Sequence, residues 1–505
     1  MKKCRVLLID VNRVSLDTSK DMLEYPLGLL YLSSSLKGAF GDQVEVRIES
    51  FDVRQHSMEQ LGIWIKDFQP DILGLRCLTM GKSPLHMIAR AAKTEFRVPL
   101  VIAGGPHATD SPLEVMSDDA FDAAAVGEGE STIVDIVRAH MTGRSLEQIP
   151  GLAVRTDQGV RLNPPQSLLL DLDQLPLPDH RAVDYVGINR GHVDFSFRYN
   201  MPHANIFTSR GCPYKCIYCH HVFGKQFRYH SPQRILEEVK ILYERDGIRT
   251  FQIIDDIFNM QSKRALRFFD LVVQSKMEIT FSFPNGVRGD IIDQEMVDAM
   301  WSGGVRYIAF AVETGSPRIQ KLIQKNLQLD KIRNAISLST ARGIVSRGFF
   351  MFGFPTETEE EVRMTIDFAT SSDLVLAMFF TVLYFPGTPL YELARSLTDI
   401  DRFNLNLEED YVSVREGPYD FSKEKLEALK LMAIRNFFFS DKRLGLFYEL
   451  VPNFYSQRDA DATMLVNIIS GNLRIGDIQN PEYAHRLRRH FLMADRFSEK
   501  SGFYV

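Results

Sequence analysis

The sequence predicts an α/β protein with two successive sheet domains and a mostly helical C-terminal part. Two runs in which apolar strands alternate with helix-type segments, separated by a proline-rich stretch at about 150–200, indicate this fold class. Three of the five cysteines lie at the start of the second run. A chain of 505 residues with 45% hydrophobic residues is long enough for about three domains with buried cores.

The first run predicts a doubly wound, Rossmann-like sheet. Its strands are almost continuously apolar, as in parallel sheets covered on both faces, so we expect a ligand at their carboxyl ends. The expected strands cover residues 5–9, 44–52, 71–78, 99–105 and 122–130, and the expected helices cover 25–40, 57–67 and 83–95.

The second run predicts a partial (β/α)6 barrel, because it offers six strands where a full barrel has eight. These strands cover residues 204–210, 250–256, 279–288, 307–315, 347–355 and 378–385, with helices expected at 231–245, 262–275, 291–301, 330–342 and 357–369. We therefore divide the chain into a first domain at 1–150, a linker at 151–200, a barrel at 201–395 and a helical domain at 396–505.

Composition narrows the class of function. The chain has 59 Lys and Arg against 65 Asp and Glu, a net charge of -6, and no long run of either sign. We therefore expect a small-molecule substrate and no nucleic-acid partner. The N-terminus has too short an apolar segment for a signal peptide, and no apolar run is long enough for a transmembrane segment, so we expect a cytoplasmic protein. Five cysteines do not make a disulfide scaffold in a chain of this size.

The motif RGCPYKCIYCHH, residues 210–221, gives the strongest indication of chemistry. Its CxxxCxxC spacing is one ligand short for a typical zinc site, whereas three thiolates can hold three irons of a four-iron four-sulfur (4Fe-4S) cluster. A chance cysteine cluster and a zinc knuckle are the alternatives. The motif, with Tyr218 before the last cysteine, resembles the signature of the radical S-adenosylmethionine (radical SAM) enzymes. This resemblance implies that Cys212, Cys216 and Cys219 are the catalytic and metal-binding residues.

The same resemblance implies that SAM binds the open iron through its amino and carboxylate groups and is cleaved to a 5'-deoxyadenosyl radical. An electron donor such as flavodoxin or ferredoxin would then be a partner. At the second strand's end, Asp255 or Asp256 would accept a hydrogen bond from the SAM ammonium group. Asn285 and Arg288, after the third strand, would bind the ribose hydroxyls and the carboxylate.

Three further residues complete the expected SAM site. Glu313 ends the fourth strand and would face a cation or the ribose, while Gly353 ends the fifth and would leave backbone room for adenine. Tyr218 belongs to the cysteine motif itself. Taken singly, such residues are as often capping or loop residues as ligands.

The first domain lacks a GxGxxG motif, and its loops instead resemble those of cobalamin-binding domains. The segments PLGLLYLSSSL (26–36), AGGPHAT (103–109) and VGEGE (126–130) carry this resemblance. Together with the radical SAM motifs, the resemblance to known families extends over about residues 1–395. In that family, paired glycines let the nucleotide tail of cobalamin pass close to the backbone. The residues expected to bind cobalamin are Asn12, Arg76, Leu78, Gly104, Gly105, Gly127 and Glu128. The alternative is a domain of this fold kept only for structure.

One departure from that family concerns the lower face of cobalt. Domains that ligate cobalt from below carry Asp-x-His-x-x-Gly after the first strand, but here Asn12 stands at the position of the histidine. We expect no imidazole ligand from this loop. Arg76 would either face cobalt without ligating it or pair with cobalamin or Asp10. Three histidines remain as candidates elsewhere: His56, His86 and His107.

The resemblance implies methylation of an unactivated carbon as in class B radical SAM methyltransferases, with methylcobalamin as the donor. The C-terminal segment 422–440 resembles the bacteriochlorophyll-cyclase branch, so ring formation or rearrangement without methyl transfer is the second hypothesis. A cobalamin-binding regulator without catalysis is a third. Aromatic and basic stretches such as RNFFF and RLRRHF suit an apolar or extended substrate, but they are more often core than pocket.

Overall fold

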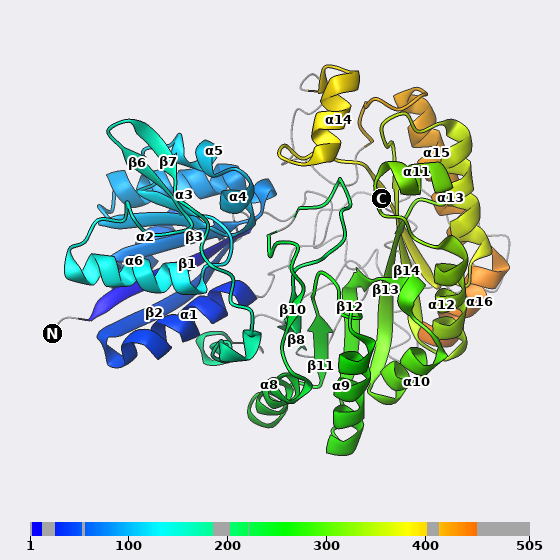
Figure 1. Ribbon diagram of the computed structural model, residues 1–505, viewed down its shortest axis with the longest axis horizontal. Helices are drawn as coiled ribbons and strands as arrows, with labels where there is room; N and C mark the ends of the chain where they lie inside the picture. The colour runs from blue at the N-terminus through cyan, green and yellow to red at the C-terminus, as the bar shows by residue number, and fades with distance from the viewer. Residues whose placement is uncertain are drawn as a thin grey trace, which may run out of the picture.

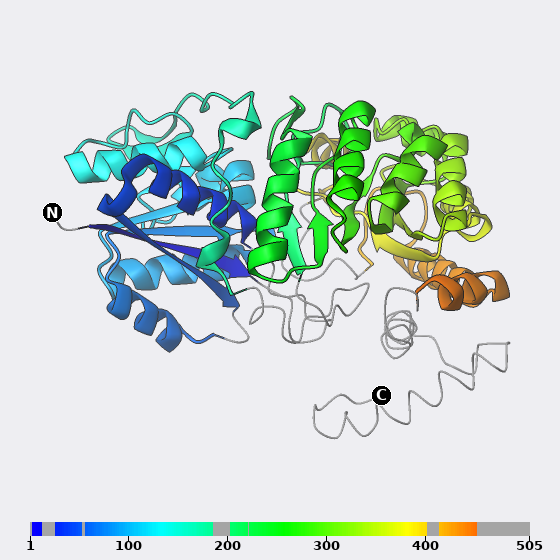
Figure 2. The ribbon, with the colours of Figure 1, turned by 90° about the horizontal axis from the view of Figure 1, so that it is seen from below.

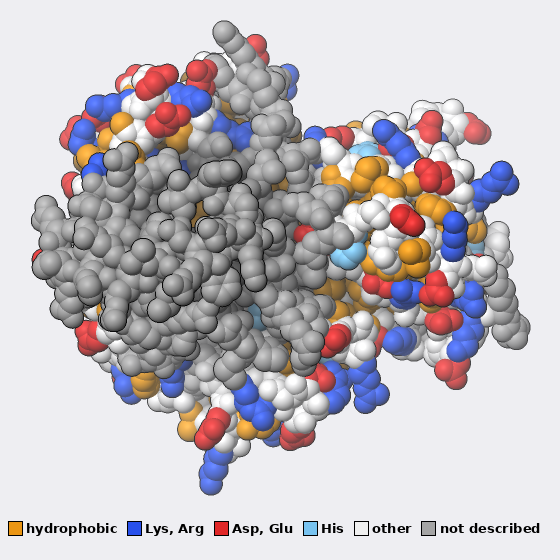
Figure 3. Space-filling view, turned by 180° about the vertical axis from the view of Figure 1, so that it is seen from behind, with side chains coloured by type: hydrophobic (Ala, Val, Ile, Leu, Met, Phe, Trp, Pro, Cys, Tyr) orange, Lys and Arg blue, Asp and Glu red, His pale blue; other side chains and the backbone are white. Residues whose placement is uncertain are grey.

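Two sheets lie side by side and form the two main domains of the chain (Figures 1 and 2). The computed structural model describes residues 3–12, 26–52, 56–184, 203–220, 222–400 and 414–451. Among these residues, no helix has the length and apolar character needed to cross a membrane. On the face of the first domain seen in Figure 3, acidic and basic side chains are mixed with hydrophobic ones.

The first sheet has seven strands in the order β2-β1-β3-β4-β5-β6-β7. Its parallel part is formed by β1 (Cys4–Asn12), β2 (Val44–Asp52), β3 (Ile72–Cys77), β4 (Leu100–Gly104) and β5 (Ala123–Ala125). Alternate residues of β1 enter two separate cores, with Leu7 on one face and Leu8 on the other, which confirms the doubly wound fold.

Helices cover both faces of this sheet. The core on one face includes side chains of α1 (Leu27–Phe40) and α6 (Glu130–Thr142). The core on the other includes side chains of α2 (Met58–Phe68), α3 (Lys82–Thr94), α4 (Gly105–Asp110) and α5 (Pro112–Met116). The loops at the carboxyl ends of β4 and β5 contact the second domain, as the site below shows.

The first sheet extends beyond residue 150. The strands β6 (Leu152–Thr156) and β7 (Gly159–Leu162) form a hairpin that pairs antiparallel with β5, within the range expected as linker. The sequence analysis missed this hairpin, because β7 has only four residues and is mostly exposed.

The second sheet has six parallel strands in the order β15-β14-β13-β12-β11-β8, which confirms the partial barrel. They are β8 (His203–Ile206), β11 (Thr250–Ile253), β12 (Thr280–Val287), β13 (Val305–Glu313), β14 (Val345–Phe352) and β15 (Leu376–Thr381). The ribbon β9 (Ser209–Arg210) and β10 (Arg228–Tyr229) follows β8. The helices of this domain are α8 (Pro232–Arg245), α9 (Ser262–Ser275), α10 (Gln294–Ser302), α11 (Pro317–Leu322), α12 (Leu329–Ala341), α13 (Glu359–Ser371) and α14 (Pro389–Leu397).

The described C-terminal helices, α15 (Lys423–Phe438) and α16 (Asp441–Leu450), pack onto the second domain (Figure 1). Leu429 and Phe437 of α15 belong to the same core as the barrel strands, and Phe437 contacts Phe379 of β15 edge to face. This part of the expected helical domain therefore shares the barrel's core. The stretch RLRRHF lies outside the described residues.

Five short 3-10 helices complete the described elements: η1 (Gly41–Gln43), η2 (Thr79–Gly81), η3 (Leu172–Gln174), η4 (His180–Ala182) and η5 (Gly289–Ile291).

Candidate active site

The three clustered cysteines lie in one loop, residues 211–227, which we call the cysteine loop and which is described apart from residue 221. The loop joins β9 to β10, whose pairing of Arg210 with Arg228 closes its base. It begins at Gly211, where φ is +82° and an added Cβ would lie 2.3 Å from the carbonyl oxygen of Gln226. Only glycine fits there without displacing the backbone.

Two of the three thiols in this loop, those of Cys212 and Cys219, have a raised pKa. Burial raises the pKa of Cys212, and burial together with the charges of Cys216 and Asp256 raises the pKa of Cys219 to about 12. Three neighbouring thiolates therefore require cations to neutralise them. Over the described ranges, no three His, Cys, Asp or Glu side chains are arranged to hold a single metal ion. A 4Fe-4S cluster takes each thiolate on a different iron, so the donor set fits this cofactor.

A hydrogen-bonded trio lies next to the cysteine loop. The hydroxyl of Tyr218 donates to Oε1 of Glu313 at 3.1 Å, and Nζ of Lys325 donates to the same oxygen at 2.8 Å and to the Tyr218 hydroxyl at 3.0 Å. Burial, followed by the charge of Glu313, raises the pKa of Tyr218 well above its usual value, so the phenol stays protonated. Glu313 is buried and has a φ of +67°, a backbone strain typical of functional sites.

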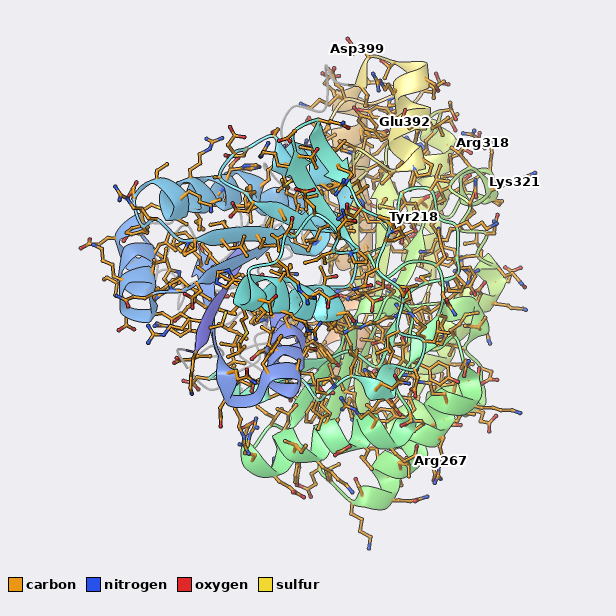
Figure 4. All side chains as sticks on the ribbon, turned by 60° about the vertical axis from the view of Figure 1, so that its left-hand side comes forward. Tyr218, Arg267, Arg318, Lys321, Glu392 and Asp399 are labelled. Atoms are coloured by element: carbon orange, nitrogen blue, oxygen red, sulfur yellow. The ribbon has the colours of Figure 1, made fainter. Side chains whose placement is uncertain are left out.

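Lys325 was missed by the sequence analysis because it follows α11 in no recognisable motif. Its ammonium group lies close enough to lower the pKa of both Cys212 and Cys219, against the larger effect of burial. Tyr218 lies inward from Arg318 and Lys321, which lie towards the rim of the molecule (Figure 4).

The two neighbouring aspartates at the end of β11 have different surroundings. Asp255 is buried and accepts hydrogen bonds from the backbone and hydroxyl of Thr208 and from the Ser209 hydroxyl, so its carboxylate fastens the start of the cysteine loop. Asp256 is exposed, and within the described ranges its carboxylate accepts one hydrogen bond, from the Gly211 amide at 3.2 Å. Of the pair, Asp256 has the carboxylate that can reach a ligand.

The two residues predicted to bind SAM at the end of β12, Asn285 and Arg288, also have different surroundings. Asn285 is exposed, and its amide donates to the carbonyl of Ile254 at 2.9 Å, which leaves its own oxygen directed elsewhere. Arg288 pairs with Asp290 at 2.8 Å and lies 3.7 Å above the ring of Tyr214 in the cysteine loop. Its charge is therefore neutralised within the protein, and it braces the loop.

Gly353 is covered by the C-terminal segment. Its φ is +92°, and an added Cβ would lie 3.3 Å from Leu426 and 3.4 Å from Tyr419. Its amide donates to Oε2 of the buried Glu357 at 2.6 Å. The expected room for adenine beside this glycine is thus partly filled by the segment that leads into α15.

In the first domain, three predicted glycines lie at the carboxyl ends of β4 and β5. Gly104 has Ala125 as its nearest neighbour, 3.9 Å from an added Cβ, and Gly127 has nothing within 4 Å. Gly105, with a φ of +82°, lies where a Cβ would approach the Arg76 side chain to 2.5 Å. Leu78, 37% exposed, lies beyond the end of β3. Small residues beside an exposed apolar one fit the close approach of a large planar ligand such as the corrin ring.

Of the two residues expected near the lower face of cobalt, the structure describes the side chain of Arg76 but not that of Asn12. Arg76 donates to Asp10 at 2.6 Å, which is the pairing considered as the alternative to a role beneath cobalt. Asn12 is the last residue of β1, and its side chain lies outside the described part.

The three candidate histidines differ in their partners. His56 accepts a bond from the Asp52 amide at 3.1 Å, and His86 contacts Asp118 at 2.8 Å. His107 is fully buried, and within the described residues neither of its ring nitrogens has a hydrogen-bond partner. Burial lowers its pKa, so it is neutral near pH 7.

Glu128 was expected near the corrin, but its carboxylate contacts the second domain. Oε2 accepts from Arg210 at 2.9 Å and from Arg228 at 3.1 Å. A further contact between the domains joins His220, directly after Cys219, to Asp110 of α4 at 2.9 Å. The cysteine loop therefore lies against the loops that carry the predicted cobalamin residues.

Two family models match the two sheet domains. The B12 binding domain matches residues 19–137, and the radical SAM superfamily matches residues 206–369. An uncharacterized methyltransferase of Pyrococcus horikoshii is 33% identical over 373 residues, covering 73% of this chain and 78% of the relative. The chain belongs to the cobalamin-binding radical SAM enzymes. As a member of this family, it uses a 4Fe-4S cluster, SAM and cobalamin.

Relatives at lower identity include a methyltransferase and a cyclase. Cytidylyl-2-hydroxyethylphosphonate methyltransferase of Streptomyces wedmorensis is 25% identical, covering 76% of this chain and 80% of the relative. The anaerobic magnesium-protoporphyrin IX monomethyl ester cyclase of Rubrivivax gelatinosus is 22% identical, covering 73% and 66%. The solved structure of the radical SAM methyltransferase TsrM from Kitasatospora setae has a TM-score of 0.66 at 21% identity, with 78% of each chain covered, which supports the fold.

Proposed function

We propose that this cobalamin-binding radical SAM enzyme methylates an unactivated carbon of a small-molecule substrate. The 33% identical relative is named a methyltransferase, as is the 25% identical one. The observation that carries the proposal is the contact between the cysteine loop and the cobalamin domain, seen at His220 and Asp110. A methyl donor and a radical-generating centre must reach the same substrate, and this contact brings their two loops together.

When bound, the cluster supplies the electron that cleaves SAM, and cobalamin carries the methyl group. Cys212, Cys216 and Cys219 would each hold one iron. Asp256 is the better of the two neighbouring aspartates for the SAM ammonium group, because Asp255 is fully engaged in fastening the loop.

The trio beside the loop would shape the rest of the SAM site. Glu313 is held in one orientation by Tyr218 and Lys325, so its second oxygen is fixed for an incoming hydroxyl or ammonium group. The positive charge of Lys325 offsets the negative charge of the thiolates and of any bound carboxylate. Asn285 supplies an amide oxygen at the end of the neighbouring strand.

The cobalamin site would use the glycines at the ends of β4 and β5. Gly104 and Gly127 leave the backbone accessible where side chains would block a planar ring, and Gly105 lets the backbone turn where a side chain would displace Arg76. Arg76, paired with Asp10, supplies no lone pair, so this side chain would not ligate cobalt from below.

A cyclase-type reaction without methyl transfer is the second candidate, because the anaerobic cyclase of Rubrivivax gelatinosus covers a similar share of this chain. Anaerobic incubation of the reconstituted enzyme with SAM carrying a trideuterated methyl group, a reductant and host metabolites separates the two. Mass spectrometry should find a product with the labelled methyl group on carbon. A product that has only lost two hydrogens would contradict methylation and support the cyclase-type reaction. A Cys216→Ala enzyme should give neither product, because the cluster is then under-ligated.

A further inference from the structure

Two arginines and two glutamates meet in a buried cluster at the junction of the domains. Arg210 donates to Glu128 at 2.9 Å and to Glu130 at 2.6 Å. Arg228 donates through both of its terminal nitrogens to the two oxygens of Glu128. We call these four residues the interdomain clamp. It joins the β9–β10 ribbon to the VGEGE segment after β5.

The clamp is shielded from water. The arginine side chains are each 2% exposed, and the glutamate side chains are 12% and 11% exposed. The guanidinium group of Arg210 also lies 4.9 Å from the ring of Tyr31 in α1 and 5.2 Å from the ring of Phe223 in the cysteine loop. Two positive and two negative charges balance, so the buried set is neutral, whereas loss of one member would leave a buried charge unpaired.

Within the clamp, Arg210 and Glu130 stabilise each other's charged form. Burial alone would lower the pKa of Arg210, but the charge and hydrogen bond of Glu130 outweigh burial and raise it above its usual value. Burial would likewise raise the pKa of Glu130, but Arg210 lowers it below its usual value. Arg210 and Glu130 are therefore both charged near pH 7.

The clamp's place in the chain links it to both cofactor loops. Arg210 is two residues before Cys212, and Arg228 follows the cysteine loop directly. On the other side, Glu128 follows Gly127, one of the glycines expected beside the corrin, and Glu130 begins α6. Each end of the cysteine loop is thus tied by a charged hydrogen bond to the same short segment of the cobalamin domain.

We infer that Arg210, Arg228, Glu128 and Glu130 are positioning residues that set the distance between the cobalamin and the iron–sulfur cluster. Glu128 then acts on the second domain rather than on the corrin. The inference rests on the proposed pairing of the two cofactors in one reaction. It goes further by assigning the geometry of that pairing to four residues that need not touch either cofactor.

Hydrogen–deuterium exchange tests the clamp in the full-length protein before any cofactor is added. Glu128→Gln removes the charge and keeps the shape, and we expect exchange to rise about tenfold in segments 203–210, 226–231 and 126–131 while the rest of both domains is unchanged. Arg228→Lys keeps the charge but loses the two-point contact, and should raise exchange about threefold. Lys37→Met is the matched control, because it breaks the Lys37–Asp179 pair, which lies outside the cofactor loops. Unchanged exchange in Glu128→Gln, or an equal rise in Lys37→Met, would overturn the inference.

Pulsed electron paramagnetic resonance of the loaded enzyme then measures the distance itself. With Co(II) cobalamin and the reduced cluster as the two spin centres, the wild type should give one narrow distance distribution, and Glu128→Gln a broader one. A distribution as narrow as that of the wild type would overturn a positioning role. If the wild type bound no cobalamin, the proposed function would fail, while the exchange experiment would still decide whether the clamp holds the two loops.

Discussion

Replacing Asp255 by asparagine tests whether this buried carboxylate fastens the cysteine loop or binds SAM. The new amide nitrogen would replace Oδ2, which accepts from the Thr208 hydroxyl at 2.5 Å and the Ser209 hydroxyl at 2.6 Å. The Thr208 hydroxyl already accepts from Arg264 at 2.6 Å, so if it also accepted from the new amide its own proton would lose its acceptor. Hydrogen bonds to a charged group contribute about 1.5–3 kcal/mol each. Burial raises the pKa of Asp255, which means that burying the charge offsets part of the stabilisation from these bonds. We therefore take the lower value of the range for each of the two bonds and expect the free energy of unfolding to fall by about 3 kcal/mol.

The two tryptophans, Trp64 and Trp301, lie in different domains, which provides the assay. In a Trp64→Phe background, Trp301 fluorescence during urea unfolding reports the second domain alone. Asp256→Asn is the control, since it removes one exposed acceptor and should cost less than about 1 kcal/mol. If Asp255→Asn unfolded within 1 kcal/mol of the parent while losing SAM binding, Asp255 would be a ligand and the reasoning here would be refuted.

Three further predictions concern other parts of the site. Gly105→Val should abolish cobalamin binding, measured as cobalt per chain. The control, Gly143→Ala, changes a glycine with a similar φ of +66° and open space around it, and should bind normally; equal binding by the two variants would contradict a cobalamin site at Gly105. Burial raises the pKa of Glu357 from 4.5 to about 8, so the stability that its protonated form provides is complete below pH 4.5 and is lost as pH rises to 8. In urea titrations at several pH values, Glu357→Gln should reduce this loss of unfolding free energy by about 1–3 kcal/mol, and the same pH dependence in the variant and the wild type would contradict the prediction. Lys325→Met should lower the midpoint potential of the cluster by about 60 mV, because a nearby cation stabilises the more negative reduced state, while Lys321→Met at the rim should leave it unchanged.

Local patterns in the sequence predicted the fold and the chemistry. The spacing of Cys212, Cys216 and Cys219 is a property of one short segment, and the alternation of strands and helices is repeated often enough to be read without long-range information. The order of the strand ends also placed Glu313 and Asp256 beside the cysteine loop, as the structure shows.

The roles that the sequence did not predict depend on contacts between residues that are distant in the chain. Glu128 and Arg228 are 100 residues apart, so no local pattern shows that this carboxylate meets an arginine instead of facing a cofactor. Asp255 and Asp256 are adjacent and chemically identical, and only the burial of Asp255 against Thr208 separates their roles. Lys325 lies 107 residues from Tyr218, and its place in the site follows from the turn after α11.

The fate of the methyl group tests the central claim, that the cysteine loop and the cobalamin domain form one catalytic site. The reconstituted, cobalamin-loaded enzyme is reduced without oxygen, given SAM with a trideuterated methyl group, and the cobalamin is then recovered for mass spectrometry. We predict cobalamin that carries the labelled methyl group, at a level reduced in the Glu128→Gln enzyme. Recovery of unlabelled cobalamin alone, from an enzyme that still cleaves SAM to 5'-deoxyadenosine, would contradict methyl transfer at this site.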